Sequence, residues 1–222
     1  MTMSLRIYEL RCPGCLNDLS GITSDKVFIC GNCQKAFGAH NGKLTEEQLF
    51  FGASQHSLDK NDITIFLPFW RFHIAPTVLD PQQNNITATT AAATLDTIWI
   101  PAFYDVRPTV FGNVGMNLTL ARIQPQLLPL SNNRIIQLPG VARRREDATL
   151  YVQPFVAGIV DRQKDISGLS INVRIGDAKL WGLPFGYDLQ TTTLTDGLLG
   201  MQYPTAMVEY FEELAFAYGI GK

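Results

Sequence analysis

Four apolar stretches stand out in the pattern of hydrophobic and polar positions along the 222-residue chain. They read ITIFLPFWRF from residue 63, DTIWIPAFYDV from residue 96, LYVQPFVAGIV from residue 150 and AKLWGLPFGYDL from residue 178. Each is rich in the β-branched or aromatic residues that favour strands, and each has a proline close to a phenylalanine. We therefore expect four strands. Because proline lacks the N–H that a sheet interior requires, each proline should lie at an edge, a bulge or a bend.

The likeness among these stretches raises the question of an internal repeat. All three tryptophans of the chain, Trp70, Trp99 and Trp181, fall within them. A fixed period of 20–50 residues, which marks repeat proteins, is not cleanly present. An internal duplication with halves near 63–145 and 147–222 and a chance likeness therefore both stay open.

Helical patterns occur in two other segments. The C-terminal sequence PTAMVEYFEELAFAYG begins with a proline suited to a first helical turn and ends at Gly219, a capping residue. Its apolar residues form one stripe with the glutamates outside it, which predicts a C-terminal helix packed on the core. In the segment 109–125 the apolar residues have helical spacing, but Gly112 and Gly115 weaken a helix, so helix and strand both remain open.

A helix start is also predicted near residue 45. Thr45 followed by Gln48 matches a capping box, which indicates a short helix at 46–52. The polar segment 54–62 that follows it predicts a domain boundary.

Composition and charge describe an ordinary folded chain. Hydrophobic residues make up 46% and charged residues 17%, and the formal net charge is −2. That charge gives no overall attraction to nucleic acid or to an anionic membrane. Arg6, Glu9 and Arg11 interrupt the place where a secretory signal would have its apolar core, and the charge-free runs are too short to span a bilayer. We therefore expect a soluble, cytoplasmic protein without a transmembrane segment.

The four cysteines carry the clearest chemistry. Cys12, Cys15, Cys30 and Cys33 follow the spacing C-x2-C-x14-C-x2-C, which is close to the four-thiolate zinc pattern. Two cysteines in a tight turn direct both sulfurs to one point, and two such turns complete a tetrahedron. Disulfides would need an oxidising compartment, and a thioredoxin-like pair would need a strand leading into a helix. Iron uses the same ligands as zinc, so this alternative stays open.

The sequence RCPGCLNDLSGITSDKVFICGNCQKAFGAHNGKL resembles a zinc ribbon, in which two zinc knuckles sit on two β-hairpins. The resemblance covers residues 6–44 and implies a strand at 27–29 before the second knuckle and an aromatic residue, Phe37, after it. Leu16 departs from the family, which usually has glycine after the first knuckle. The expected organisation is a zinc ribbon at 1–44, a capped short helix and linker at 45–62, and a β-rich domain at 63–222. The expected fold class is thus mainly β with a few helices (α+β).

The function that the sequence favours is non-enzymatic. Four thiolates fill the coordination sphere of one structural zinc ion per chain, so the metal would have no open position for a substrate. The sequence contains no nucleophile elbow, phosphate loop or HExxH motif, and it identifies no small-molecule substrate. Phe69, Trp70, Arg71 and Phe72 would form an interaction surface if they pointed outward, and core if they pointed inward.

We therefore expect an adaptor or assembly subunit that contacts other protein subunits or itself. The alternative is a nucleic-acid-associated zinc-ribbon protein of transcription, replication or translation. It is disfavoured because residues 1–44 have an excess charge of only +2.

Overall fold

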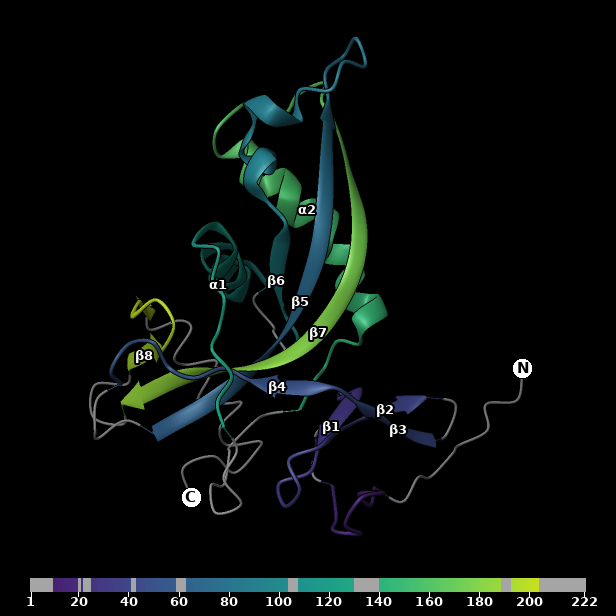
Figure 1. The fold of residues 1–222 in the computed structure, drawn as a ribbon, viewed down its shortest axis with the longest axis vertical. Coiled ribbons are helices and arrows are strands. Elements are labelled where there is room, and N and C mark those ends of the chain that lie inside the picture. The colour runs from purple at the N-terminus through teal and green to yellow at the C-terminus, as the bar shows by residue number, and fades with distance from the viewer. Residues whose placement is uncertain are drawn as a thin grey trace.

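The protein contains two mainly antiparallel β-sheets (Figure 1). The computed structural model describes residues 10–19, 21, 25–40, 43–58, 63–103, 108–129, 140–188 and 193–203. The smaller sheet has the order β1-β2-β3, and the larger sheet has the order β6-β5-β7-β8-β9 with β4 beside β7. The small-sheet strands are β1 (Val27–Ile29), β2 (Ala36–His40) and β3 (Lys43–Glu47). The large-sheet strands are β4 (Leu49–Phe51), β5 (Ile63–Leu79), β6 (Thr97–Pro101), β7 (Ser170–Asp188), β8 (Thr193–Asp196) and β9 (Gln202–Tyr203).

The helices cover the large sheet. They are α1 (Pro108–Leu120), α2 (Arg145–Asp161) and the short 3-10 helices η1 (Thr87–Thr89) and η2 (Ala91–Thr94). In the view of Figure 1, α2 passes behind the long ribbon of β5 and β7, and α1 lies beside β6. Strands predominate over helices among these elements, which confirms the predicted β-rich α+β class.

The antiparallel pair β5 and β7 is the backbone of the large sheet. Its register runs from Ile63 opposite Tyr187 to Leu79 opposite Ser170, with a bulge near Phe72. Because strand side chains alternate between faces, β5 buries residues on both sides. Ile65, Leu67 and Phe69 pack with α1, while Trp70, Phe72 and Ile74 pack with α2. This double burial explains why β5 is a nearly continuous apolar run.

The strand prolines lie where the sheet requires no N–H donor. Pro68 accepts a hydrogen bond from the N–H of Ala102, the residue directly after β6. Pro184 likewise accepts from the N–H of Gly197, directly after β8. A strand residue directs its N–H and C=O to the same side, so each missing N–H faces the end of a partner strand. Pro101 lies on the edge strand β6. The prediction of an edge, a bulge or a bend therefore holds for Pro101, whereas Pro68 and Pro184 lie within the β5–β7 pairing, opposite Gly182 and Phe66.

The stretch from residue 150 is helical, so the expected strand there is wrong. It lies in α2, whose buried residues recur at helical spacing of three or four: Ala148, Val152, Val156, Ile159 and Val160. Burial of this stripe against the sheet outweighs the backbone cost of Pro154 inside the helix. Pro154 lies on the exposed side and takes no part in the stripe.

The segment 109–125, where helix and strand were balanced, contains α1. Gly115 has a packing role there, because a Cβ atom at this position would collide with the carbonyl oxygen of Trp99. The side-chain hydroxyl of Thr119 accepts a hydrogen bond from the N–H of Trp99 at 3.0 Å and donates to the Gly115 carbonyl at 2.7 Å. The glycine thus permits α1 to lie directly on β6.

The short helix predicted at 46–52 is also wrong. Residues 43–47 form β3 and residues 49–51 form β4, so the chain passes from the small sheet to the large sheet at Gln48. The Thr45 hydroxyl donates across the sheet to the Gly38 carbonyl instead of capping a helix. Five paired positions with β2 stabilise the extended conformation more than one isolated cap would stabilise a helix.

The described elements of the two halves follow different orders, β5-β6-α1 and then α2-β7-β8-β9. The order of elements therefore gives no support to an internal duplication. The C-terminal helix expected at 204–219 lies outside the described residues.

Candidate metal centre

The four cysteines come from two similar turns, Cys12–Cys15 and Cys30–Cys33. In the first, the N–H of Leu16 donates to the Cys12 carbonyl at 2.9 Å. In the second, the N–H of Gln34 donates to the Cys30 carbonyl at 2.8 Å. These equivalent bonds close each turn around its pair of sulfurs.

The residue after each pair has an unusual backbone conformation. Leu16 has φ = 63° and Gln34 has φ = 57°, both in the left-handed region that favours glycine. The departure from the ribbon pattern at Leu16 is therefore a leucine held in a glycine conformation. Its side chain is 74% exposed.

The sulfur atoms converge on one point. Cys12 Sγ lies 3.5 Å from Cys33 Sγ, Cys15 Sγ lies 3.5 Å from Cys30 Sγ, and all four lie within 4.8 Å of one another. A disulfide would require an S–S distance of about 2.05 Å. Four sulfurs around a zinc ion at about 2.3 Å would be separated by about 3.8 Å, which fits the observed spacing. The cluster can therefore hold a metal ion.

The environments of the thiols differ. Cys12 and Cys30 are buried, whereas Cys15 and Cys33 are partly exposed. Hydrogen bonds from the Asn17 backbone and the Asn32 side chain lower the pKa of Cys15 to about 6. Burial raises the pKa of Cys33 to about 12 and also raises that of Cys30. A bound cation would favour the thiolate form of every ligand, so metal binding would release protons.

The small sheet is fixed to the large body through residues 140–144. Val27 and Val141 form a β-bridge, with the Val141 N–H donating to the Val27 carbonyl at 3.0 Å. The guanidinium of Arg144, directly before α2, donates to the Ala39 carbonyl of β2 at 2.7 Å. Val27 and Ala36 belong to the same buried cluster as the sheet face under α2. The cysteine cluster is thus attached to the helix that covers the large sheet.

The aromatic surface expected at residues 69–72 is not exposed. Phe69 and Phe72 are 0% exposed and Trp70 is 3% exposed, so these rings form core. The Trp70 indole N–H donates to the Arg143 carbonyl at 2.8 Å. Only Arg71 remains partly accessible. The expected surface is therefore wrong for the three rings, because residues on both faces of β5 are covered.

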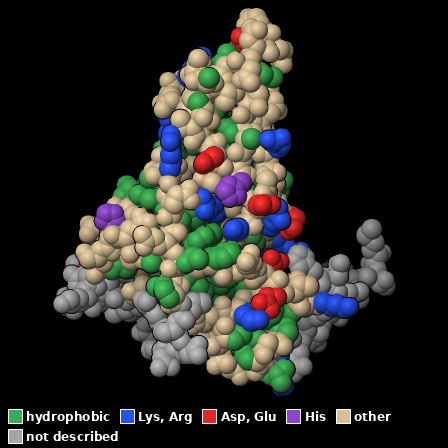
Figure 2. Space-filling model, in the orientation of Figure 1, with side chains coloured by type: hydrophobic (Ala, Val, Ile, Leu, Met, Phe, Trp, Pro, Cys, Tyr) green, Lys and Arg blue, Asp and Glu red, His purple; other side chains and the backbone are tan. Residues whose placement is uncertain are grey.

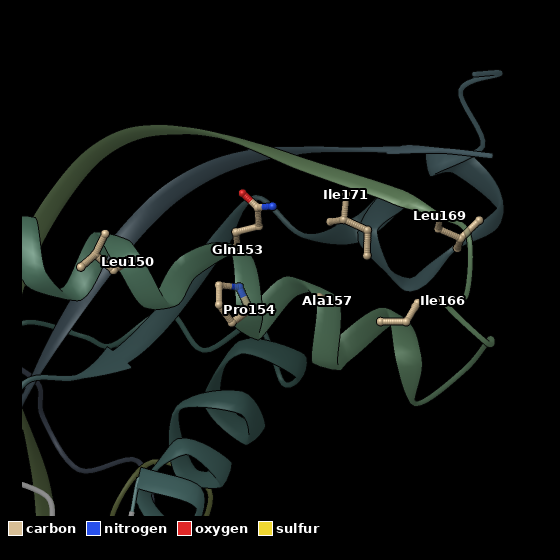
Figure 3. A pocket seen from close by; sticks show the side chains of 7 residues that line it. All are labelled: Leu150, Gln153, Pro154, Ala157, Ile166, Leu169 and Ile171. Carbon is tan, nitrogen blue, oxygen red and sulfur yellow. The ribbon is translucent and has the colours of Figure 1, made fainter. Parts of the chain in front are cut away.

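An apolar groove lies instead along one flank of α2, between this helix and the start of β7. Its volume is about 410 Å³, and its lining comes from α2, from the segment that leads into β7 and from the start of β7 (Figure 3): Leu150, Gln153, Pro154, Ala157, Ile166, Leu169 and Ile171. Leu150 is 75% exposed and the neighbouring Tyr151 is 39% exposed. We call this surface the α2 groove. The sequence prediction of a strand from residue 150 did not include this surface. With helical spacing, Leu150 lies outside the buried stripe of α2, which is the signal for an exposed apolar residue.

Among the described residues, the cysteine cluster is the one group of three or more His, Cys, Asp or Glu side chains placed to hold a metal ion. Comparison of the chain with protein-family models, curated proteins and solved structures returned no match. No described helix is long and apolar enough to cross a bilayer.

Proposed function

We propose that this protein is a non-enzymatic adaptor or assembly subunit that binds another protein through the α2 groove. The observation that carries the proposal is the exposed apolar lining of the groove. Leu150 leaves three quarters of its side chain in water, beside apolar residues of α2 and of the segment before β7. Contiguous apolar surface on a folded protein is a common mark of a protein contact.

The cysteine cluster has a structural role in this proposal. We propose that it is a zinc ribbon that binds one zinc ion per chain, with the four thiolates closing the coordination sphere. The small sheet has a small core of its own, so metal binding would supply folding free energy, of order 10 kcal/mol in comparable sites. Because thiolates persist in a reducing compartment, we place the protein in the cytoplasm.

The metal would also fix the position of α2. Arg144 and Val141, which precede α2, hydrogen-bond to the small sheet. An ordered ribbon therefore holds the start of the helix that forms one wall of the groove. We propose that zinc binding and the protein contact are linked through this connection.

The test is the assembly state of the protein purified from its native cells. Affinity capture and size-exclusion chromatography with light scattering should show a stoichiometric protein partner or a self-associated form. Leu150→Ser should release the partner, because it removes the most exposed apolar side chain of the groove. Leu127→Ser is the matched control, since Leu127 is 60% exposed but does not line the groove. A lone monomer for the wild type, or equal loss of the partner in both variants, would refute the proposal.

A further inference from the structure

A row of side chains crosses the large sheet on the face opposite α2. Arg71 of β5 pairs with Trp99 of β6 on one side and with Lys179 of β7 on the other. Directly paired residues of neighbouring strands project to the same face. Two cations are therefore placed opposite each other, an arrangement that destabilises a sheet unless an anion compensates for it.

Aromatic rings, rather than carboxylates, lie beside both cations. The Arg71 guanidinium lies 5.6 Å from the centroid of Trp99, and the Lys179 ammonium lies 5.4 Å from that of Phe50. Phe50 stacks on Trp181 at 5.2 Å, and Trp181 meets Trp99 edge to face at 6.2 Å. We call these five residues the cation–aromatic cluster. Figure 2 shows Lys and Arg side chains next to a hydrophobic patch on the face of the molecule that it views.

Unpaired hydrogen-bond donors are concentrated in this cluster. Four buried side-chain nitrogen atoms of the described residues have no hydrogen-bond partner, and three of them are Arg71 Nε, Trp99 Nε1 and Trp181 Nε1. Trp99 is 0% exposed and Trp181 is 6% exposed. Buried donors in native proteins normally have acceptors, so the cluster leaves three donors unsatisfied among the described residues. These three nitrogen atoms are themselves buried, so a ligand from outside would contact the accessible parts of Arg71 and Lys179.

The described carboxylates do not supply that acceptor. No ion pair links Arg71 or Lys179 to an acidic side chain in the described part of the chain. The Arg71 guanidinium donates to the side-chain oxygen of Gln124, and burial lowers its pKa while the more distant Asp96 raises it. A partly desolvated guanidinium without a carboxylate partner is costly, and an anion from outside the chain would remove that cost.

We propose that the cation–aromatic cluster binds a carboxylate side chain from an acidic segment of a protein partner. A carboxylate fits the accessible cations of the cluster, because Arg71 is partly exposed and Lys179 is exposed. Single-stranded nucleic acid fits less well, since bases would need open ring faces for stacking. Trp181 and Lys179 cover the ring of Phe50, and the two tryptophans are buried.

This inference rests on the proposed adaptor function only in assuming that the carboxylate belongs to a protein partner. The cation–aromatic cluster and the α2 groove lie on opposite faces of the sheet, so binding at one does not depend on binding at the other. It adds a second contact with a defined chemistry, so a partner would combine an apolar segment with an acidic one. The two proposals can fail separately.

The experiment is a titration of the ¹⁵N-labelled protein with blocked hexaglutamate at low ionic strength, followed by NMR. The Nε–H signal of Arg71 and the indole signals of Trp99 and Trp181 should shift and saturate together. Hexaglutamine is the uncharged control peptide. Leu150→Ser should leave these shifts unchanged, which separates this result from a failure at the α2 groove.

Two charge variants test the position of the site. Lys179→Gln should raise the dissociation constant for hexaglutamate at least fivefold. Arg174→Gln removes the same charge from another exposed position of β7 and should change it less than twofold. The proposal is overturned if the three signals do not saturate, if both variants weaken binding equally, or if an eight-residue oligothymidylate binds more tightly than hexaglutamate through Lys179.

Discussion

Replacing Leu16 by glycine should tighten metal binding at the cysteine cluster. Leu16 holds φ = 63° in the turn formed by the first cysteine pair. The side chain is 74% exposed, so its removal gives up little buried apolar surface. What changes is the steric cost of placing a Cβ atom in the left-handed region.

The magnitude follows from two opposing effects. A non-glycine residue pays about 1–2 kcal/mol in the left-handed conformation. Glycine loses about 0.5–1 kcal/mol more conformational free energy than alanine when the chain becomes ordered. The net gain is therefore about 0.5–1 kcal/mol if the strain is present only when the turn is formed, which corresponds to a two- to fivefold lower dissociation constant for zinc.

The assay is a zinc competition titration against a chromophoric chelator at fixed pH. Leu16→Ala is the matched control, because it removes the same exposed side chain but keeps the Cβ atom. We expect Leu16→Ala to bind zinc like the wild type and Leu16→Gly to bind it more tightly. Equal affinities for the two variants would show that backbone strain at Leu16 does not affect the metal site.

Two further predictions concern metal and pH. Elemental analysis should find one zinc ion per chain, and chelation should abolish hydrogen-exchange protection in β1–β3 before the pairing of β5 with β7 is lost; simultaneous loss would contradict a metal requirement confined to the small sheet. Burial raises the pKa of the Asp196 carboxyl group, so the folded protein binds the carboxyl proton more tightly than the unfolded chain does. The protonated carboxyl group therefore contributes stability that is fully present below the pKa of the unfolded chain. This contribution is lost as the pH rises through the pKa of the folded protein. In the wild type the Leu198 N–H donates to the Asp196 carboxylate at 2.6 Å, and Asp196→Asn keeps an oxygen acceptor for this bond. Urea titrations should show that the variant has a higher free energy of unfolding than the wild type at pH 7 but not near pH 3. Equal free energies of unfolding at pH 7 would show that the buried charge of Asp196 has no cost.

The cysteine cluster was the part of the protein most accessible to sequence reasoning. Its chemistry depends on local spacing, and two tight turns bring the sulfurs of each pair together whatever the rest of the chain does. The strands from residues 63, 96 and 178 were predictable for a similar reason, because each of these stretches is a local apolar run that contains β-branched or aromatic residues.

Long-range packing decided the features that were mispredicted. Thr45 has a sound local signal for a helix cap, but the pairing of β3 with β2 overrides it. The stretch around Pro154 contains strand-favouring residues, yet its buried residues match one face of a helix that the sheet can cover. The parallel pairing of β4 with β7 joins Leu49 to Leu180, and no local pattern contains that information.

The cation–aromatic cluster could not be predicted for the same reason. Its members come from four strands, and the only local feature of Arg71 is its position between Trp70 and Phe72. Arg71 lies opposite Lys179 because of the register of β5 and β7, and this register depends on the whole length of the two strands. The aromatic rings next to Arg71 are buried because helices pack on both faces of the sheet, and the local sequence does not contain this information.

The pairing of β5 with β7 also has a consequence for synthesis of the chain. Residues 80–169 separate the two strands, so their alignment closes a long loop. The entropic free-energy cost of closing this loop exceeds the cost for a four-residue hairpin by about 3 kcal/mol at 25 °C, so we expect slow folding. While the ribosome is still translating residues 80–169, Ile65, Leu67 and Phe69 have no β7 to cover them. The nascent chain therefore carries an apolar strand without its partner for much of its synthesis, and the yield of folded protein should depend on chaperones that bind such segments.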